Sequence, residues 1–113
     1  MRSKLSSLSK NDDFKYLLNG KKISNKYLTI FFRRLTDKDN NKLNISFVTK
    51  KKIGNAVIRN KIKRRLRNIM NESVKKIKLN LNYSYLIIAK KTIFEDSYGK
   101  IKEILFADFK KIK

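Results

Sequence analysis

The amino-acid sequence predicts an α/β fold, an α+β sandwich in which helices pack on a small central sheet. The first observation behind this prediction is the order of periodic segments, which is helix, strands, helix, strand, helix. The second is composition: 113 residues, 41% hydrophobic and 11% aromatic, suffice for the core of a single domain over residues 1–113. The third is the unbroken apolar run from Tyr85 to Ala89, which is typical of a strand covered on both faces. Residues 1–7 precede the first element, and we expect them to be flexible.

Residues 9–19 predict the first helix. Phe14, Leu17 and Leu18 fall on one face of it at helical spacing. Gly20 follows as a natural helix stop, so a short helix with one apolar face is expected here.

Two strands are predicted after this helix. Residues 26–35 are rich in β-branched and aromatic side chains, and residues 43–49 alternate apolar and polar side chains. One face of the first strand carries Leu28, Ile30 and Phe32, and the other face carries Tyr27, Thr29, Phe31 and Arg33. The polar residues 36–42 predict a turn between the two strands, so we expect the strands to pair antiparallel.

The second half of the chain predicts a long helix, a strand and a last helix. The long helix covers residues 55–72, follows Gly54 and has Asn55 as its expected N-terminal cap. The apolar strand 85–89 is expected at the centre of the sheet, where a strand covered on both faces is often parallel. Residues 97–111 predict the last helix, with an apolar stripe at Ile101, Ile104, Leu105, Phe109 and Ile112.

Composition excludes several functional classes. The chain contains no Cys and no His, so it has no disulfide, no zinc finger, no Cys or His nucleophile and no histidine base. The first ten residues are basic and polar with no apolar segment after them, which argues against a signal peptide. The longest apolar run is too short to cross a membrane. We therefore expect a soluble, cytoplasmic protein with no membrane partner.

The formal net charge of +21 indicates an anionic partner. Lys is abundant throughout, as an A+T-rich coding sequence would produce, but such drift does not explain the arginines. Four of the seven arginines lie between Arg59 and Arg67. The surrounding segment 50–67 holds nine basic residues and no acid. This segment is therefore the main candidate for a binding surface.

A helical projection separates this segment into two faces. Ile58, Ile62, Leu66 and Ile69 form a narrow apolar stripe that is expected to pack on the sheet. The opposite arc carries Arg59, Asn60, Lys63, Arg64 and Arg67, and Lys61 and Arg65 border the stripe. Like charges four residues apart destabilise an isolated helix by a few tenths of a kcal/mol each, so counter-charge is expected from outside. Phosphate fits best, because the guanidinium fork of arginine matches two phosphate oxygens.

Two simpler interpretations of this helix stay open at this point. A basic helix is often only a solvated face, although acids are then usually interspersed with the bases. A helix lying on a membrane surface is disfavoured, because the apolar stripe is narrow, lacks aromatic residues and is needed to cover the sheet. Nucleic acid is the better candidate partner.

The same segment resembles the Arg-Asn-Arg signature of the bacterial ribonuclease P protein subunit. The residues that carry the resemblance are Lys51-Lys52-Ile53-Gly54-Asn55-Ala56-Val57-Ile58-Arg59-Asn60-Lys61-Ile62-Lys63-Arg64. Leu8 to Phe14 is similar to the start of the family's first helix, and Tyr85 to Lys90 is similar to its late strand. The resemblance covers about residues 5–110. Lys61 stands where the signature has its second arginine.

The resemblance implies a fold and a function. The strand-helix-strand crossover around the signature helix would be left-handed, against the usual rule. The protein would join a catalytic RNA and assist removal of the 5′ leader from precursor tRNA. The RNA would perform the chemistry, and no side chain of the protein would be catalytic. Mg²⁺ would be bound mainly by the RNA, with no organic cofactor and no metal site on the protein. One protein per RNA is expected, and the protein without RNA would be inactive.

The resemblance also implies two sets of site residues. The surface for the catalytic RNA would comprise Lys51, Lys52, Asn55, Arg59, Asn60, Lys61, Lys63, Arg64, Arg65 and Arg67. A cleft for the 5′ leader would comprise Phe14, Leu18, Phe31, Lys63 and Arg67. Leu18 stands where many family members carry a second aromatic residue. Without the resemblance, Phe14 and Phe31 would be interpreted as ordinary core residues.

Two rival functions are weighed against this one. An enzyme acting through its own side chains is disfavoured, because the carboxylate pairs Asp12-Asp13 and Glu95-Asp96 are explained by helix starts. A ribosomal protein or a general RNA chaperone is not excluded by charge alone. Reconstitution with a ribonuclease P RNA would distinguish these functions.

Overall fold

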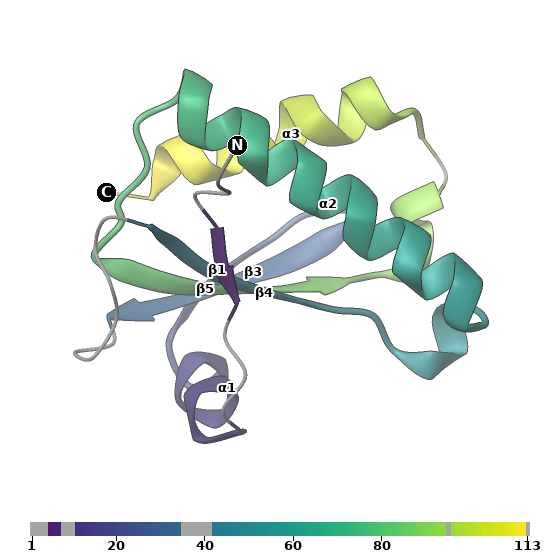
Figure 1. The fold of residues 1–113 in the computed structure, drawn as a ribbon, viewed down its shortest axis with the longest axis horizontal. Helices are drawn as coiled ribbons and strands as arrows, with labels where there is room; N and C mark the ends of the chain where they lie inside the picture. Colours follow the sequence, from purple (N-terminus) through teal and green to yellow (C-terminus); the bar gives the residue numbers. More distant parts are fainter. Residues whose placement is uncertain (1–4, 8–10, 35–41, 95, 113) are drawn as a thin grey trace.

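The computed structural model describes residues 5–7, 11–34, 42–94 and 96–112, which form a five-stranded sheet and three α-helices (Figure 1). The strands are β1 (Leu5–Ser7), β2 (Lys21–Ser24), β3 (Leu28–Arg34), β4 (Leu43–Val48) and β5 (Tyr83–Ala89). The helices are α1 (Asn11–Leu18), α2 (Ala56–Lys76) and α3 (Tyr98–Lys111), with short 3-10 turns η1 (Lys51–Ile53) and η2 (Lys91–Phe94). The predicted α+β sandwich is confirmed.

The strand β5 lies at the centre of the sheet, whose strand order is β1-β4-β5-β3-β2. It pairs parallel with β4 and antiparallel with β3. The central position predicted from its apolar run is confirmed. The predicted antiparallel pairing of the strands at 26–35 and 43–49 is wrong, because β5 lies between them. A strand that is apolar on both faces is best covered at the centre of the sheet, where helices pack over both faces, and this outweighs the local tendency to form a hairpin.

The crossover from β4 through α2 to β5 is left-handed, as the resemblance implied. In Figure 1 both strands run from left to right, β4 lies nearer the viewer than β5, and α2 returns above them. Most parallel crossovers have the opposite hand.

The sheet carries a different layer on each face (Figure 1). The main core lies between the sheet and the helices α2 and α3, and it includes Tyr85 and Ile87 of the central strand. The alternate residue Leu86 faces the other way and packs with Leu17 of α1. The side-chain alternation along β5 therefore assigns α1 to one face and α2 to the other.

The strand β3 shows the predicted alternation, with one exception. Leu28, Ile30 and Phe32 lie in the main core, and Phe31 lies on the α1 face. The exception is Tyr27, which was assigned to the face of Phe31 but is 1% exposed within the main core. Tyr27 precedes the first residue of β3, so strand alternation does not govern its side chain.

The helix α2 begins one residue after its predicted cap and extends four residues beyond its predicted end. The side chain of Asn55 accepts a hydrogen bond of 3.0 Å from the backbone N–H of Ile58, which confirms the cap. Ile62, Leu66 and Ile69 are each 1% exposed, but Ile58 is 36% exposed. The first turn of α2 extends beyond the ends of the strands (Figure 1), so the apolar stripe loses its partner there.

Two further strands were not predicted. The edge strand β2 pairs antiparallel with β3, and β1 pairs parallel with β4. The segment 1–7 was expected to be flexible; residues 5–7 form β1, and residues 1–4 lie outside the described residues. Within the described part of the chain, no helix has the length and apolar character needed to span a membrane.

Candidate nucleic-acid interface

The first candidate surface is the polar side of α2 together with the turn η1 before it. We call it the α2 cation surface. Seven of its members are exposed: Lys51, Lys52, Asn55, Asn60, Lys61, Arg64 and Arg67. The remaining three are half-buried: Arg59, Lys63 and Arg65. All ten residues predicted for the catalytic RNA thus belong to one continuous stretch of helix and turn.

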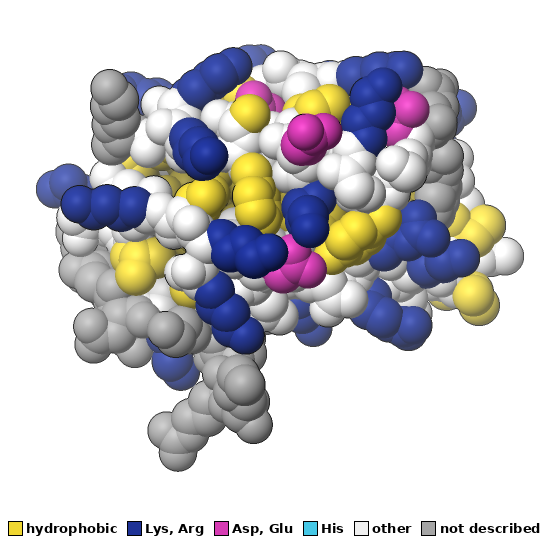
Figure 2. All heavy atoms as spheres, turned by 90° about the horizontal axis from the view of Figure 1, so that it is seen from above, with side chains coloured by type: hydrophobic (Ala, Val, Ile, Leu, Met, Phe, Trp, Pro, Cys, Tyr) yellow, Lys and Arg dark blue, Asp and Glu magenta, His cyan; other side chains and the backbone are white. Residues whose placement is uncertain are grey.

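Carboxylates elsewhere in the structure are engaged by other lysines. Glu72 forms ion pairs with Lys102 at 3.0 Å and with Lys76 at 4.0 Å. The Lys102 side chain is also the main reason that the pKa of Glu72 is lowered. Figure 2, a view from the side of α2 and α3, shows acidic side chains among the lysines and arginines of this face. Charge is therefore partly balanced over α3 and the C-terminal half of α2, while the segment 50–67 contains no acid.

Two polar groups on α2 bear directly on ligand binding. The Nε atom of Arg59 is buried and has no hydrogen-bond partner among the described residues. A buried donor without a partner is costly, and an external acceptor would satisfy it. Asn55 uses its side-chain oxygen for the helix cap, so its amide nitrogen is the group that can donate to a ligand.

The second candidate surface lies on the α1 face of the sheet. Phe14 and Phe31 are both half-buried and pack against Leu17 and Leu86, which are 0% and 2% exposed. Leu18, also predicted for this cleft, is 47% exposed. The two phenylalanines thus contribute to a small core and still present part of their surface.

Beside Phe31 the surface forms a hollow of about 330 Å³. Its lining includes Thr29, Phe31 and Ile88 together with four lysines: Lys50, Lys52, Lys90 and Lys91. We call this the lysine-rimmed hollow. It combines an aromatic side chain with cations, the combination that binds single-stranded nucleic acid.

The structure does not bring every predicted cleft residue to this hollow. Lys63 and Arg67 belong to α2, which packs on the face of the sheet opposite to Phe14 and Phe31. Sequence reasoning missed Lys90 and Lys91 instead. The signal for them was available, because two lysines directly after a central strand must lie at the end of the sheet.

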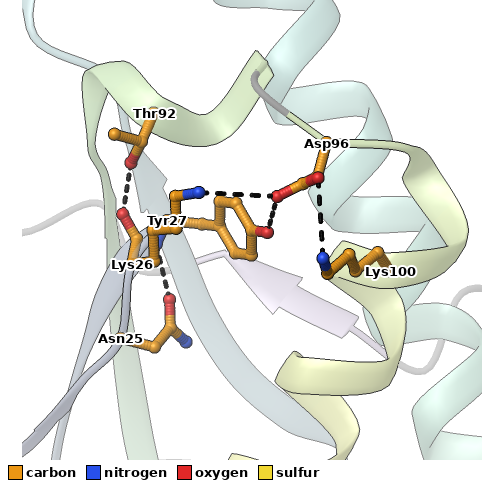
Figure 3. Close-up of polar contacts among 6 residues, drawn as sticks. All are labelled: Asn25, Lys26, Tyr27, Thr92, Asp96 and Lys100. Carbon is orange, nitrogen blue, oxygen red and sulfur yellow. Dashed lines mark hydrogen bonds and ion pairs between the residues drawn. The ribbon is translucent and has the colours of Figure 1, made fainter.

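A polar network anchors the part of the rim that contains Lys90. Its ammonium donates hydrogen bonds of 2.6 Å to the backbone oxygen of Asn25 and 2.8 Å to the hydroxyl of Ser24. The side chain of Asn25 accepts a hydrogen bond of 2.8 Å from the N–H of Tyr27. The Thr92 hydroxyl donates to the backbone oxygen of Lys26 (Figure 3). These contacts fix the turn between β2 and β3 against the segment that follows β5.

Asp96 connects the same turn to α3 (Figure 3). It accepts a hydrogen bond from the phenol of Tyr27 and forms ion pairs of 3.8 Å with both Lys26 and Lys100. The hydrogen bond from Tyr27 is the main reason that the pKa of Asp96 is lowered, and the two lysines lower it further. Asp96 therefore has a structural role in this network.

The described residues contain no group of three or more Asp or Glu side chains that could hold a metal ion. The two candidate surfaces suit the binding of an anionic polymer. One surface is a basic helix, and the other is an aromatic hollow with a cationic rim.

A family model described as Ribonuclease P matches residues 2–113. The chain belongs to the ribonuclease P protein family. Curated relatives with the name ribonuclease P protein component include one from Mycoplasma capricolum, 33% identical over 94% of each chain. Another, from Fusobacterium nucleatum, is 35% identical over 95% of this chain and 89% of its own.

Solved structures of ribonuclease P proteins share this fold. The protein from Thermotoga maritima superposes with a TM-score of 0.79 at 26% identity, over 96% of this chain and 98% of its own. A Staphylococcus aureus structure gives a TM-score of 0.76 at 26% identity, over 94% of this chain and 93% of its own. The family is that of the protein subunit of ribonuclease P, with a role in tRNA processing. Membership implies partnership with the ribonuclease P RNA.

Proposed function

We propose that this protein binds the catalytic RNA of ribonuclease P through the α2 cation surface and the 5′ leader of precursor tRNA in the lysine-rimmed hollow. It thereby assists the endonucleolytic removal of the leader and broadens the range of substrates. The observation that carries the proposal is that these two surfaces meet at the turn η1, where Lys52 contributes to both.

The hollow suits a leader because a leader is single-stranded. Phe31 offers part of its ring to an unpaired base, and such stacking contributes about 1–3 kcal/mol per base. Stacking tolerates any base, and Lys50, Lys52 and Lys91 can contact phosphates that every leader contains. Lys90 adds charge from the position that its two hydrogen bonds fix. A site of this kind can accept leaders of many sequences.

The α2 cation surface suits a folded RNA because its groups are fixed on a rigid helix. Arginines present paired donors to phosphate oxygens, and Asn60 can donate to or accept from a sugar or base edge. Arg59 brings a buried Nε that lacks a partner among the described residues. Binding of RNA would supply the counter-charge that the segment 50–67 lacks.

The reaction itself is assigned to the RNA. The carboxylates of Glu72, Asp96 and Asp108 lie in ion pairs with lysines, and none belongs to either candidate surface. Mg²⁺ would be held mainly by RNA phosphates, and no organic cofactor is required. The protein would raise the affinity for substrate and for Mg²⁺. Its cations would also take over part of the charge neutralisation that the RNA otherwise needs from free Mg²⁺. We place it in the cytoplasm, with one protein per catalytic RNA.

The test is reconstitution with a bacterial ribonuclease P RNA and a precursor tRNA. The protein should lower the Mg²⁺ concentration needed for cleavage and should bind precursor tightly only together with the RNA. Cleavage by the protein alone in Mg²⁺ would refute the assignment of catalysis to the RNA. Absence of any effect on cleavage by the RNA would refute the proposed function as a whole.

A matched pair of variants tests the hollow. Lys91→Gln removes a cation from the rim, whereas Lys110→Gln removes another exposed cation, from α3. The rim variant should weaken precursor binding several-fold and leave binding of mature tRNA unchanged, while the α3 variant should change neither. Equal losses with both variants would show that only net charge matters.

A further inference from the structure

A second hollow, of about 390 Å³, lies at the opposite end of β3. We call it the distal hollow. Its lining includes Asn19, Gly20, Lys21, Arg33, Arg34 and Tyr83. Like the lysine-rimmed hollow, it combines aromatic and cationic side chains. None of these residues was predicted as a site from the sequence.

One wall of the distal hollow is pre-formed by a contact between α1 and β3. The guanidinium of Arg33 lies over the ring of Tyr16, 3.7 Å from its centroid, and donates a hydrogen bond of 3.2 Å to the Tyr16 backbone oxygen. Tyr16 is still 41% exposed. Arg33 is thus held in place before any ligand arrives, which lowers the entropy lost on binding.

Gly20 keeps the chain close to the sheet at this wall. A Cβ atom at position 20 would lie 2.8 Å from the backbone oxygen of Phe32 and 2.9 Å from the Cβ of Arg33. The absence of a side chain lets the segment after α1 lie directly on β3. The hollow is therefore bounded by backbone that has little room to shift.

The distal hollow also offers cations and an aromatic ring. Lys21 and Arg34 are exposed, and no ion pair to either is found within the described ranges. The ring of Tyr83 is half-buried and is held in an edge contact with Phe32, with centroids 5.3 Å apart. Phosphates can meet the two cations while a base stacks on a fixed ring.

The two hollows lie along the same strand. Thr29 and Phe31 of β3 line the lysine-rimmed hollow, whereas Arg33 and Arg34 line the distal hollow. The five steps from Thr29 to Arg34 span about 17 Å at the rise of a β-strand. Phe32 and Tyr83 belong to the α2 and α3 side of the sheet, and Phe31 belongs to the α1 side. A single RNA strand that leaves the first hollow along β3 and α1 therefore passes over the end of the sheet at Arg33 and Arg34 and reaches the second hollow after a few nucleotides.

We propose that the distal hollow binds single-stranded RNA from the leader, at nucleotides farther from the cleavage site than those in the lysine-rimmed hollow. This inference rests on the proposed function, because it extends the path of the same leader. Lys21 and Arg34 contact phosphates, Arg33 adds charge from its fixed position, and Tyr83 stacks on a base. The affinity for precursor then depends on leader length beyond what the first hollow can hold.

The test uses the reconstituted holoenzyme and precursors whose leaders are shortened one nucleotide at a time. The double variant Lys21→Gln/Arg34→Gln removes two cations of the distal hollow. As a control, the double variant Lys78→Gln/Lys110→Gln removes two exposed cations that line a different hollow, one from the segment after α2 and one from α3. With the wild type, affinity should rise as the leader lengthens past the first hollow. In the distal-hollow variant this second rise should disappear, giving a several-fold loss confined to long leaders. Its salt slope should fall by about 1.4, at about 0.7 per phosphate contact with a single strand.

Each outcome has a distinct meaning. If affinity rises equally with leader length in the wild type and the distal-hollow variant, the inference is refuted while the proposed function stands. If no leader of any length improves affinity, the proposed function itself fails. If the variant weakens assembly with the catalytic RNA but not the dependence on leader length, the hollow binds that RNA instead and the leader assignment is overturned. A photoreactive nucleotide in the distal leader should cross-link near Tyr83 in the wild-type complex.

Discussion

The phenol of Tyr27 donates a hydrogen bond to the carboxylate of Asp96, and it thereby joins the start of β3 to the N-terminal end of α3. Tyr27 is 1% exposed, so its ring is part of the main core while its hydroxyl reaches the polar network at the edge. The same network holds Lys90 at the rim of the lysine-rimmed hollow. A contact within the core thus contributes to the geometry of a binding surface.

This contact predicts a pH-dependent loss of stability. The hydrogen bond from Tyr27 lowers the pKa of Asp96 below the ordinary value of 3.8. A carboxyl group whose pKa is lower in the folded state stabilises the fold above its unfolded pKa, and this contribution is lost as pH falls through the folded pKa. Tyr27→Phe should therefore lower the free energy of unfolding at neutral pH, and the difference from wild type should shrink below about pH 4. Urea unfolding at several pH values measures it, and a difference that does not vary with pH would contradict the prediction.

Substitutions at two successive residues of β5, one on each face of the sheet, should have different effects on RNA binding. Leu86→Ala and Ile87→Ala should each lower the free energy of unfolding by about 2–5 kcal/mol, because both side chains are buried. Only Leu86 packs with Leu17 of α1, so only its loss should also weaken precursor binding. The measurement is precursor affinity at a temperature where circular dichroism shows both variants folded. Equal binding by the two variants would show that α1 does not shape the cleft.

Substitution by alanine at Gly20 and at Gly99 should change the stability of the protein in opposite directions. Gly20→Ala should destabilise the protein, because the new Cβ would lie 2.8 Å from a backbone oxygen of β3. Gly99→Ala in α3 should stabilise it by about 0.5–1 kcal/mol, since alanine favours helix. A Cβ at position 99 meets nothing within 4 Å. Thermal unfolding of the two variants should therefore shift in opposite directions, and a shift of both to higher temperature would contradict the close approach at Gly20.

The two candidate surfaces predict separable binding defects. Phe31→Ala should weaken binding of precursor by about 1–3 kcal/mol through loss of stacking, with little effect on mature tRNA. Arg64→Ala should weaken assembly with the catalytic RNA and reduce the salt slope by about 1. Filter binding with the RNA, with precursor and with mature tRNA distinguishes the two. Equal effects of both variants on mature tRNA would contradict this division.

The features that were predictable from the sequence depend on local patterns. The apolar run of β5, the cap at Asn55 and the alternation of Leu28, Ile30 and Phe32 all follow from side chains near one another in the chain. The strand order does not, because a polar turn after β3 is equally compatible with a hairpin and with a longer connection. The exposure of Ile58 was also not predictable, since helical spacing does not show where the sheet under a helix ends.

The candidate sites show the same difference: a site built from residues near one another in the chain was predictable, and sites built from distant elements were not. The α2 cation surface was predicted because all of its residues lie on one helix and the turn before it. The hollows join residues from distant elements, such as Phe31 with Lys91 and Asn19 with Tyr83. Lys63 and Arg67 were placed in the leader cleft by resemblance, whereas the structure puts α2 and α1 on opposite faces of the sheet. Which RNA contacts them stays a prediction.

Lys52 belongs both to the α2 cation surface and to the rim of the lysine-rimmed hollow. If the catalytic RNA occupies the first and the leader the second, two polyanions approach each other at this residue. Their mutual repulsion is greatest where they are closest, and Lys50 and Lys51 add positive charge at the same point. The turn η1 would then act as a fixed counterion between two RNA strands, performing locally what a high salt concentration would otherwise have to do.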